Sequence, residues 1–449
     1  MQRLRNFLLL MLMVSGVTGI PVAWPQSSDW EVAFINVNVI PMDAERILQG
    51  HTVLVRGDRI IQVGPVAEVK VSAQALRVDG TGKYLMPGLA EMHAHIPSQQ
   101  EPQEFTEAVL FLYVANGVTT ARGMLGAPNQ FELRDKAQRG EIVSPTLYLA
   151  GPSFSGRSIQ SPEEAIQKVQ QQKHEGWDLL KIHPGLTRAA YDAMATTAQQ
   201  VGMRFVGHVP AEVGLLHALE MGQETIDHVD GYVEYLQAGD GPVDEAKLAD
   251  VVRRTAEAGT WIVPTMAVWE VLLGACDLET LLSYAEVKYM PPQQVEYWKN
   301  AYHNRLSGPQ YSRQRANQIA ANRKRILQAL HNGGVRILFG TDAPQQFSVP
   351  GFSIQREIAV MLQSGLTAYD ILRSGTKNVG DYFKHKDTFG TVAVGQRADV
   401  ILVEGNPLED VANIAKRSGV MVRGRWLPEA EIQERLAKIE ALYRTPASR

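Results

Sequence analysis

Short apolar runs alternate with amphipathic helical stretches through most of this 449-residue chain. Such alternation is typical of βαβ units, whose strands form a parallel sheet. Eight runs can be counted, at residues 85–96, 118–123, 146–151, 179–183, 205–209, 225–229, 261–265 and 337–341. Eight strand–helix repeats predict an α/β fold of the (β/α)8 TIM-barrel type, which we expect at residues 85–387.

The stretches between the runs carry helix signals of their own. Ser161 followed by Pro162 is typical of a helix start, and Gly176 and Gly202 stand where a helix should end before a strand. One connection, at about residues 266–312, is rich in aromatic side chains and too long for a plain loop. It is predicted to form helices. A lid over the barrel mouth is the preferred interpretation, and surface decoration is the alternative.

The segments on either side of the barrel have the pattern of strands and turns. Residues 30–84 contain short strands, and residues 388–427 return to the same pattern. Residues 30–84 cannot close a core alone, so the two segments are predicted to pair into one small split β-sandwich. Residues 428–449 are expected to form a charged helix and a tail.

The first 23 residues have the pattern of a signal peptide. Arg3 and Arg5 precede a short apolar run at residues 7–14, and small residues follow. The run is short for a membrane span, although an uncleaved N-terminal anchor is the alternative. No later stretch is long and apolar enough to cross a bilayer. The protein is therefore expected to be exported, to the periplasm or the cell exterior.

Charge and cysteine content exclude several classes of function. The formal net charge is -4 and no basic patch stands out, so no nucleic-acid partner is expected. Cys276 is the one cysteine, which excludes an intramolecular disulfide and a cysteine-based zinc site. Any metal must be held by His, Asp, Glu or a modified side chain, as suits zinc or manganese. The sequence leaves open whether the chain forms a homo-oligomer.

Residues that can bind a metal stand at the ends of the predicted barrel strands. His93 and His95 are two apart, so in a strand both project to one side. Four more candidates end later strands: Lys181, His208, His228 and Asp342. Active sites of such barrels lie at the carboxyl ends of the strands. Any one of these residues is as easily structural, but the set predicts a metal site.

The same residues carry a resemblance to a known family. The motifs are Pro-Gly-Leu-x-x-Met-His-x-His at 87–95, Lys181, the strand ends at His208 and His228, Gly-Thr-Asp at 340–342, and Gly-Thr-Val-x-x-Gly-Gln-x-Ala-Asp at 390–399. In order and spacing they resemble the amidohydrolase superfamily, over about residues 30–427. Within it the chain is most similar to the imidazolonepropionase-related and prolidase-like dipeptidase branch.

The resemblance implies a binuclear metal centre. His93 and His95 would hold the more buried ion together with Asp342, while His208 and His228 would hold the second. Lys181 would be N6-carboxylated and bridge both ions. An ammonium has no lone pair for a metal, whereas a carbamate offers two anionic oxygens. The alternative for Lys181 is an ion pair with a nearby carboxylate. Both ions are expected to be zinc, with manganese as the alternative.

The implied reaction is hydrolysis of a carbon–nitrogen amide bond in a small molecule. Two divalent ions would lower the pKa of a bridging water, and the hydroxide would attack the carbonyl carbon. Asp342 would act as general base and pass the proton to the leaving amine. A dipeptide or an N-acyl amino acid is the expected substrate type. Tyr232, Arg122 and His183 are candidate substrate contacts, each with a structural role as the alternative.

Three other functions remain open. A mononuclear deaminase or cyclic-amide hydrolase of the same superfamily would usually carry a glutamate three residues after the histidine of strand five. Here Ala211 stands three after His208, and Glu212 comes one later, which disfavours deamination. Lactone, ester or phosphoester hydrolysis would suit the same ligands. A non-catalytic scaffold would usually have lost ligands, and none is missing.

Overall fold

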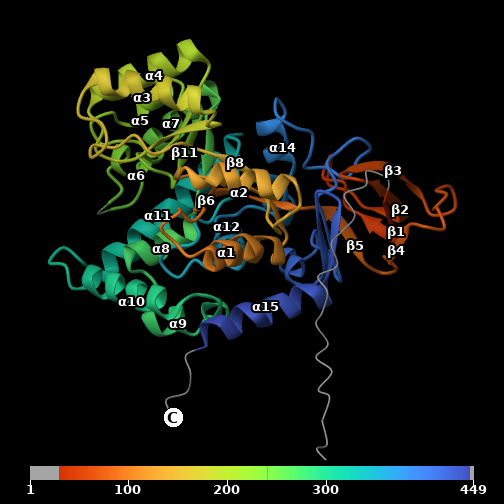
Figure 1. The fold of residues 1–449 in the computed structure, drawn as a ribbon. Helices are drawn as coiled ribbons and strands as arrows, with labels where there is room; N and C mark the ends of the chain where they lie inside the picture. Colours follow the sequence, from red (N-terminus) through yellow and green to blue (C-terminus); the bar gives the residue numbers. More distant parts are fainter. Residues whose placement is uncertain (1–29, 240, 445–449) are drawn as a thin grey trace, which may run out of the picture.

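The computed structural model describes residues 30–239 and 241–444 (Figure 1). The predicted signal peptide lies outside these residues. Within them, no helix has both the length and the apolar character needed to span a membrane.

The strands predicted for the barrel are present and parallel. The three strands β6 (Leu89–Ala94), β7 (Val118–Gly123) and β8 (Thr146–Leu149) form one sheet in that order. A second sheet contains β9 (Leu179–Ile182), β10 (Arg204–Gly207), β11 (Thr225–Asp227) and β12 (Trp261–Val263). Each strand has an almost entirely buried burial pattern, as expected where helices cover a parallel sheet.

Further hydrogen bonds join these two sheets into a ring. A parallel bridge between Ala150 and Leu179 links β8 to β9. The eighth run is an irregular segment: Ile337 bridges to Ile262 of β12, and Phe339 accepts a 2.9 Å hydrogen bond from Met92 of β6. The last segment therefore lies between β12 and β6, and the predicted (β/α)8 barrel fold is confirmed.

Helices follow the barrel strands and cover them. They include α1 (Gln103–Ala115), α2 (Asn129–Gln138), α3 (Pro162–Glu175), α4 (Arg188–Val201), α5 (Leu215–Glu220), α7 (Glu245–Ala258), α11 (Arg313–Asn332) and α12 (Ile354–Gln363). At the start of α3, the Ser161 side chain accepts from Glu164 N, as the sequence predicted. Its end at Gly176 has φ 88°, a left-handed conformation that favours glycine.

The N- and C-terminal segments share one sheet beside the barrel. Its strands are β1 (Glu31–Val39), β2 (Leu48–Arg56), β3 (Arg59–Pro65), β4 (Leu76–Asp79), β5 (Tyr84–Pro87), β13 (Val400–Val403), β14 (Arg417–Val422) and β15 (Arg425–Pro428). The order is β15-β14-β13-β5-β1-β2-β3, with β4 against β1. The prediction that the two segments pair with each other is confirmed. Their strands are hydrogen-bonded as one continuous sheet, where the sequence analysis expected a sandwich.

The first predicted barrel strand is two strands in different sheets. Within the run 85–96, β5 pairs with β1 and β13 of the small sheet, whereas β6 pairs with β7 of the barrel. Gly88 lies at the change of sheet, where a Cβ atom would come within 2.2 Å of Thr119 Oγ1. A residue without a side chain thus lets the chain pass close to the barrel wall.

The long connection forms helices, as predicted. They are α8 (Met266–Leu273), α9 (Leu278–Leu282), the 3₁₀ helix η1 (Ala285–Tyr289) and α10 (Pro292–Leu306). Trp298 of α10 is fully buried, with its ring centroid 5.5 Å from that of Phe347, in the loop that follows Asp342. The insertion therefore packs on the side of the barrel where the strands end. Figure 1 shows α8, α9 and α10 far from β1–β4.

The last helix, α15 (Glu429–Tyr443), packs on the outside of the barrel. Glu440 pairs with Lys288 of η1 at 2.8 Å, and the Arg435 guanidinium lies 5.5 Å from the ring centroid of Phe111 in α1. This helix connects the small sheet to the insertion (Figure 1).

Candidate metal centre

Three of the predicted ligands converge at the end of β6. His93 is buried, and His95 follows the strand with a quarter of its side chain exposed. Asp342 Oδ1 lies 2.7 Å from His95 Nε2 and 3.5 Å from His93 Nε2. One ligand atom from each of the three residues lies within 4.8 Å of the others. They can therefore hold one divalent cation.

Two further histidines extend this cluster. The ring centroid of His228 lies 4.4 Å from that of His93 and 4.5 Å from that of His208. His228 Nδ1 lies 2.7 Å from Thr265 Oγ1, and His208 Nδ1 lies 2.5 Å from Asp230 Oδ2. A partner on Nδ1 orients the ring and leaves Nε2 as the nitrogen to face a metal.

Lys181 lies inside the cluster. Its side chain is fully buried, with Nζ 3.4 Å from His93 Nε2 and 3.8 Å from Asp227 Oδ2. Burial, the largest influence, lowers the pKa of this ammonium to about 8. This position is compatible with both interpretations of Lys181. It lies among the predicted ligands, as a metal-bridging carbamate would, and Asp227 is the carboxylate with which its ammonium would form an ion pair.

Burial also keeps the imidazoles neutral. The pKa of His93 and that of His228 are lowered well below the usual value, first by burial and then by neighbouring positive charge. Neutral imidazoles keep a lone pair for a metal. The donor set of imidazoles, a carboxylate and a buried lysine therefore fits divalent cations.

Asp227 contacts His93, Arg122 and Lys181 beneath the site, a role that the sequence analysis missed. It is fully buried and lies 3.2 Å from Arg122 Nη2. Its Oδ2 approaches His93 Nδ1 to 2.9 Å, though out of line for a hydrogen bond. Burial alone would raise the pKa of this carboxyl, but the charges of Arg122 and Lys181 lower it. In the sequence, the signal for this role is the position of Asp227 next to the predicted ligand His228.

Glu91 is a second buried carboxyl that the sequence analysis did not single out. Oε1 accepts from His93 N at 3.0 Å and Thr341 N at 2.7 Å, and Oε2 accepts from Thr341 Oγ1 at 2.6 Å. Burial raises its pKa to about 8. Glu91 therefore joins the first strand of the barrel to the last segment, and it holds the backbone of His93 and of Thr341, the residue before Asp342.

Two of the predicted ligands have an unusual backbone conformation. His228 has φ 64° and Asp342 has φ 63°, and Val229 follows with φ 54°. Residues other than glycine rarely adopt this left-handed region, and such strain is often found at functional sites. At His228, the Arg323 guanidinium donates to the backbone carbonyl and so helps to hold the turn.

The three candidate substrate contacts lie in different surroundings. Tyr232 is fully buried, with its hydroxyl 2.7 Å from Thr255 Oγ1, so this placement offers no surface to a substrate. Arg122 is also fully buried and donates to Met92 O and Asp227, which makes it a support of the ligands. His183 is the one that stays beside the cluster, with its ring centroid 5.1 Å from that of His208.

Trp269 of the insertion also borders the cluster. Its ring centroid lies 6.0 Å from that of His228, and the Arg323 guanidinium lies 4.4 Å from the Trp269 centroid. The buried Nε1 of Trp269 makes no hydrogen bond within the described part of the chain. The sequence analysis recognised the insertion as aromatic but did not identify the residue that reaches the site.

Comparisons with solved structures agree with this fold. The solved structure of a bottromycin amidohydrolase superposes with a TM-score of 0.75, at 23% identity, over 94% of this chain and 91% of that one. A Xaa-Pro dipeptidase with methionine in its active site has a TM-score of 0.67, at 20% identity, over 89% of this chain and 100% of that one. At such identities these likenesses establish the fold.

Sequence comparisons establish the family. An adenine deaminase from Rubrobacter xylanophilus is 35% identical over 406 residues, which cover 88% of this chain and 57% of that enzyme. The chain thus spans little more than half the length of that relative. A sequence model of the amidohydrolase family matches residues 84–427. Since this match covers most of the chain, the protein belongs to the amidohydrolase family.

Proposed function

We propose that this enzyme hydrolyses a carbon–nitrogen amide bond in a small molecule of the dipeptide or N-acyl amino acid type. The observation that carries the proposal is the convergence of six side chains from five barrel segments, namely His93, His95, Lys181, His208, His228 and Asp342. The fold shared with a bottromycin amidohydrolase and a Xaa-Pro dipeptidase supports the same reaction class.

The cluster would hold two divalent cations, zinc or manganese. His93, His95 and Asp342 would bind one ion, His208 and His228 the other, and a carboxylated Lys181 both. When bound, such cations supply positive charge that lowers the pKa of a water molecule and polarises a carbonyl group. Because the Lys181 side chain is fully buried among the imidazoles, a carbamate there would be shielded from bulk water.

The residues of the chain would then position and move a proton. Asp342, nearly buried and in contact with both His93 and His95, would accept the proton of the attacking water and deliver it to the leaving nitrogen. Asp230 and Thr265 would keep the rings of His208 and His228 oriented. His183 and Trp269, which border the cluster, are the side chains that a substrate would meet.

Deamination is the second candidate, and the relatives named adenine deaminase favour it. Two observations weigh against it. The residue three after His208 is Ala211, which cannot transfer a proton, and Glu212 is exposed. Lys181, for which a mononuclear site has no need, lies within the cluster.

A substrate panel separates these functions. The zinc- or manganese-loaded enzyme is offered dipeptides, N-acyl amino acids, adenine, lactones and a phosphotriester, and each product is measured directly. We expect turnover of the amide substrates and a loss of at least about 100-fold in kcat for Asp342→Asn, because a general base contributes about 10²–10⁴-fold. Release of ammonia from adenine without amide hydrolysis would establish the deaminase instead.

A further inference from the structure

A cavity of about 800 Å³ lies at the opposite end of the barrel from the metal cluster. Arg204 and Trp261, the first residues of β10 and β12, line it, as does Glu224, which precedes β11. Arg336 lines it too, just before the eighth barrel segment. The remaining wall comes from Gly259 at the end of α7, from α13 (Ala368–Gly375), and from α14 (Lys377–Phe383) with the residues that follow it.

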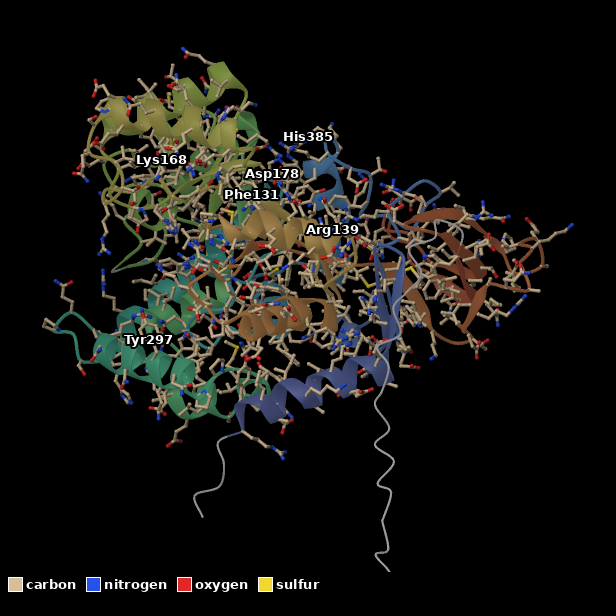
Figure 2. All side chains as sticks on the ribbon, viewed as in Figure 1. Phe131, Arg139, Lys168, Asp178, Tyr297 and His385 are labelled. Carbon is tan, nitrogen blue, oxygen red and sulfur yellow. The ribbon has the colours of Figure 1, made fainter. Side chains whose placement is uncertain are left out.

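The strands themselves show that this cavity is separate from the catalytic site. The strand that starts at Arg204 leads to His208, and the one that starts after Glu224 leads to His228. Four residues of strand span roughly 13 Å. Figure 2 shows His385 of the cavity beside α14, far from Tyr297 of the insertion on the other side of the molecule. A molecule in this cavity would not touch the metal ligands.

The cavity has an excess of positive charge. Both of its carboxylates are neutralised: Glu224 by Arg204, at 2.5 and 2.6 Å, and Asp381 by Lys377, at 2.5 and 2.6 Å. Arg336, Arg373 and Lys384 are exposed and form no ion pair with any carboxylate of the described chain. Three unpaired cations on one cavity contrast with a net charge of -4 for the whole chain.

Aromatic rings hold two of the guanidinium groups in place. The Arg336 guanidinium lies 4.0 Å from the centroid of Trp261, and the Arg204 guanidinium lies 4.0 Å from that of Tyr382. Arg336 Nη2 also donates to Gly259 O at 2.6 Å. Stacked guanidiniums are ordered before a ligand arrives, and their planar N–H groups match phosphate and carboxylate oxygens.

We propose that this cavity is a second ligand site, which binds a small molecule bearing two or more phosphate or carboxylate groups. Arg336, Arg373 and Lys384 would contact its anionic groups, while Trp261 and Tyr382 form an apolar wall beside them. The volume lies within the range of small-molecule sites. This inference is independent of the reaction proposed for the metal centre.

Calorimetric titration of the metal-loaded enzyme tests the site. The probes are inorganic phosphate, inorganic pyrophosphate and tricarballylate, a tricarboxylate. The test variant is Arg373→Gln with Lys384→Gln. The matched control is Arg77→Gln with Lys70→Gln, which removes the same charges from exposed side chains of the small domain without a described ion pair. Circular dichroism establishes that both double variants are folded.

We expect wild type and control to bind at least one probe with equal affinity, and the test variant to bind it at least about tenfold more weakly, since it loses two charged hydrogen-bond donors. Preference for pyrophosphate would indicate a phosphate ligand, and preference for tricarballylate a carboxylate ligand. Equal binding by all three proteins would locate the anion elsewhere, for example at the metals, and overturn the proposal. No binding of any probe at 10 mM would overturn it too.

Discussion

Two histidines of this chain make the same contact with an aspartate, and only one of them lies in the metal cluster. His208 Nδ1 lies 2.5 Å from Asp230 Oδ2, and His217 Nε2 lies 2.5 Å from Asp192 Oδ1. A carboxylate behind a ligating imidazole fixes its tautomer and raises its basicity. The aspartate beside His208 should therefore matter to metal binding, whereas the one beside His217 should not.

The variant Asp230→Asn is predicted to weaken the binding of the more loosely held metal ion by about 10–100-fold, because His208 loses its orienting charge. Zinc affinity is measured by competition with a chelator of known strength. Asp192→Asn serves as the control and should leave the affinity unchanged. Equal affinities for Asp230→Asn and wild type would show that His208 is not a ligand.

For single residues, the sequence predicts candidate metal ligands better than it predicts the residues that hold those ligands in position. His93 and His95 could be proposed because strand alternation alone brings them to one side. Asp227 supports His93 from another strand, so its role depends on a contact that no local pattern encodes. Tyr232 follows a ligand closely, but its side chain turns toward Thr255 in α7.

Among the elements, α8 begins directly after Thr265, the partner of His228. Glu357 of α12 caps this helix: its carboxylate accepts from Met266 N and Ala267 N, each at 2.8 Å. The Glu357 side chain is fully buried, and burial raises its pKa to about 7. The folded chain therefore binds a proton on Glu357 more tightly than the unfolded chain does. This tighter binding stabilises the folded chain fully below about pH 4.5, and the stabilisation is lost as the pH rises through about 7.

Glu357→Gln should remove this pH dependence. In wild type, the ionisation of Glu357 is predicted to lower the free energy of unfolding by roughly 2–3 kcal/mol between pH 5 and pH 8. Urea unfolding of the metal-free protein at both pH values measures the difference. Over this pH range, the loss of unfolding free energy should be smaller in Glu357→Gln than in wild type by the same amount. The exposed substitution Glu296→Gln should behave as wild type. An unchanged slope in Glu357→Gln would contradict the assignment.

The order of elements was predictable, and one boundary was not. Periodicity and helix signals predict eight strand–helix repeats and a helical insertion, because these patterns are local. The run 85–96 is apolar on both sides of Gly88, since both β5 and β6 are buried. Nothing in its composition shows that the chain changes sheets there.

In the whole molecule, Arg397 joins the small sheet to the barrel. Its side chain is 3% exposed and donates to Asp399 Oδ2, to Asp387 Oδ2 and to Thr120 Oγ1 of β7, each at 2.7 Å. It belongs to the motif at 390–399, which the sequence analysis identified without a role for this residue. The structure gives that role: the arginine joins the two parts of the fold.

Arg397→Met is predicted to lower the free energy of unfolding by about 3–5 kcal/mol, because it leaves the buried carboxylate of Asp399 without its cation. Chemical denaturation measures the loss. Arg56→Met removes an exposed arginine that pairs with Glu31 on the same sheet, and should cost at most about 1 kcal/mol. Comparable losses in the two variants would show that Arg397 does not join the domains.

The central claim is that six side chains from five barrel segments form one metal centre bridged by Lys181. Metal analysis of the protein after reconstitution with zinc and bicarbonate tests it most directly, on wild type and Lys181→Ala side by side. We predict two ions per wild-type chain and at most one per variant chain. Two ions in Lys181→Ala, or a single ion in wild type that the substitution leaves in place, would contradict the account.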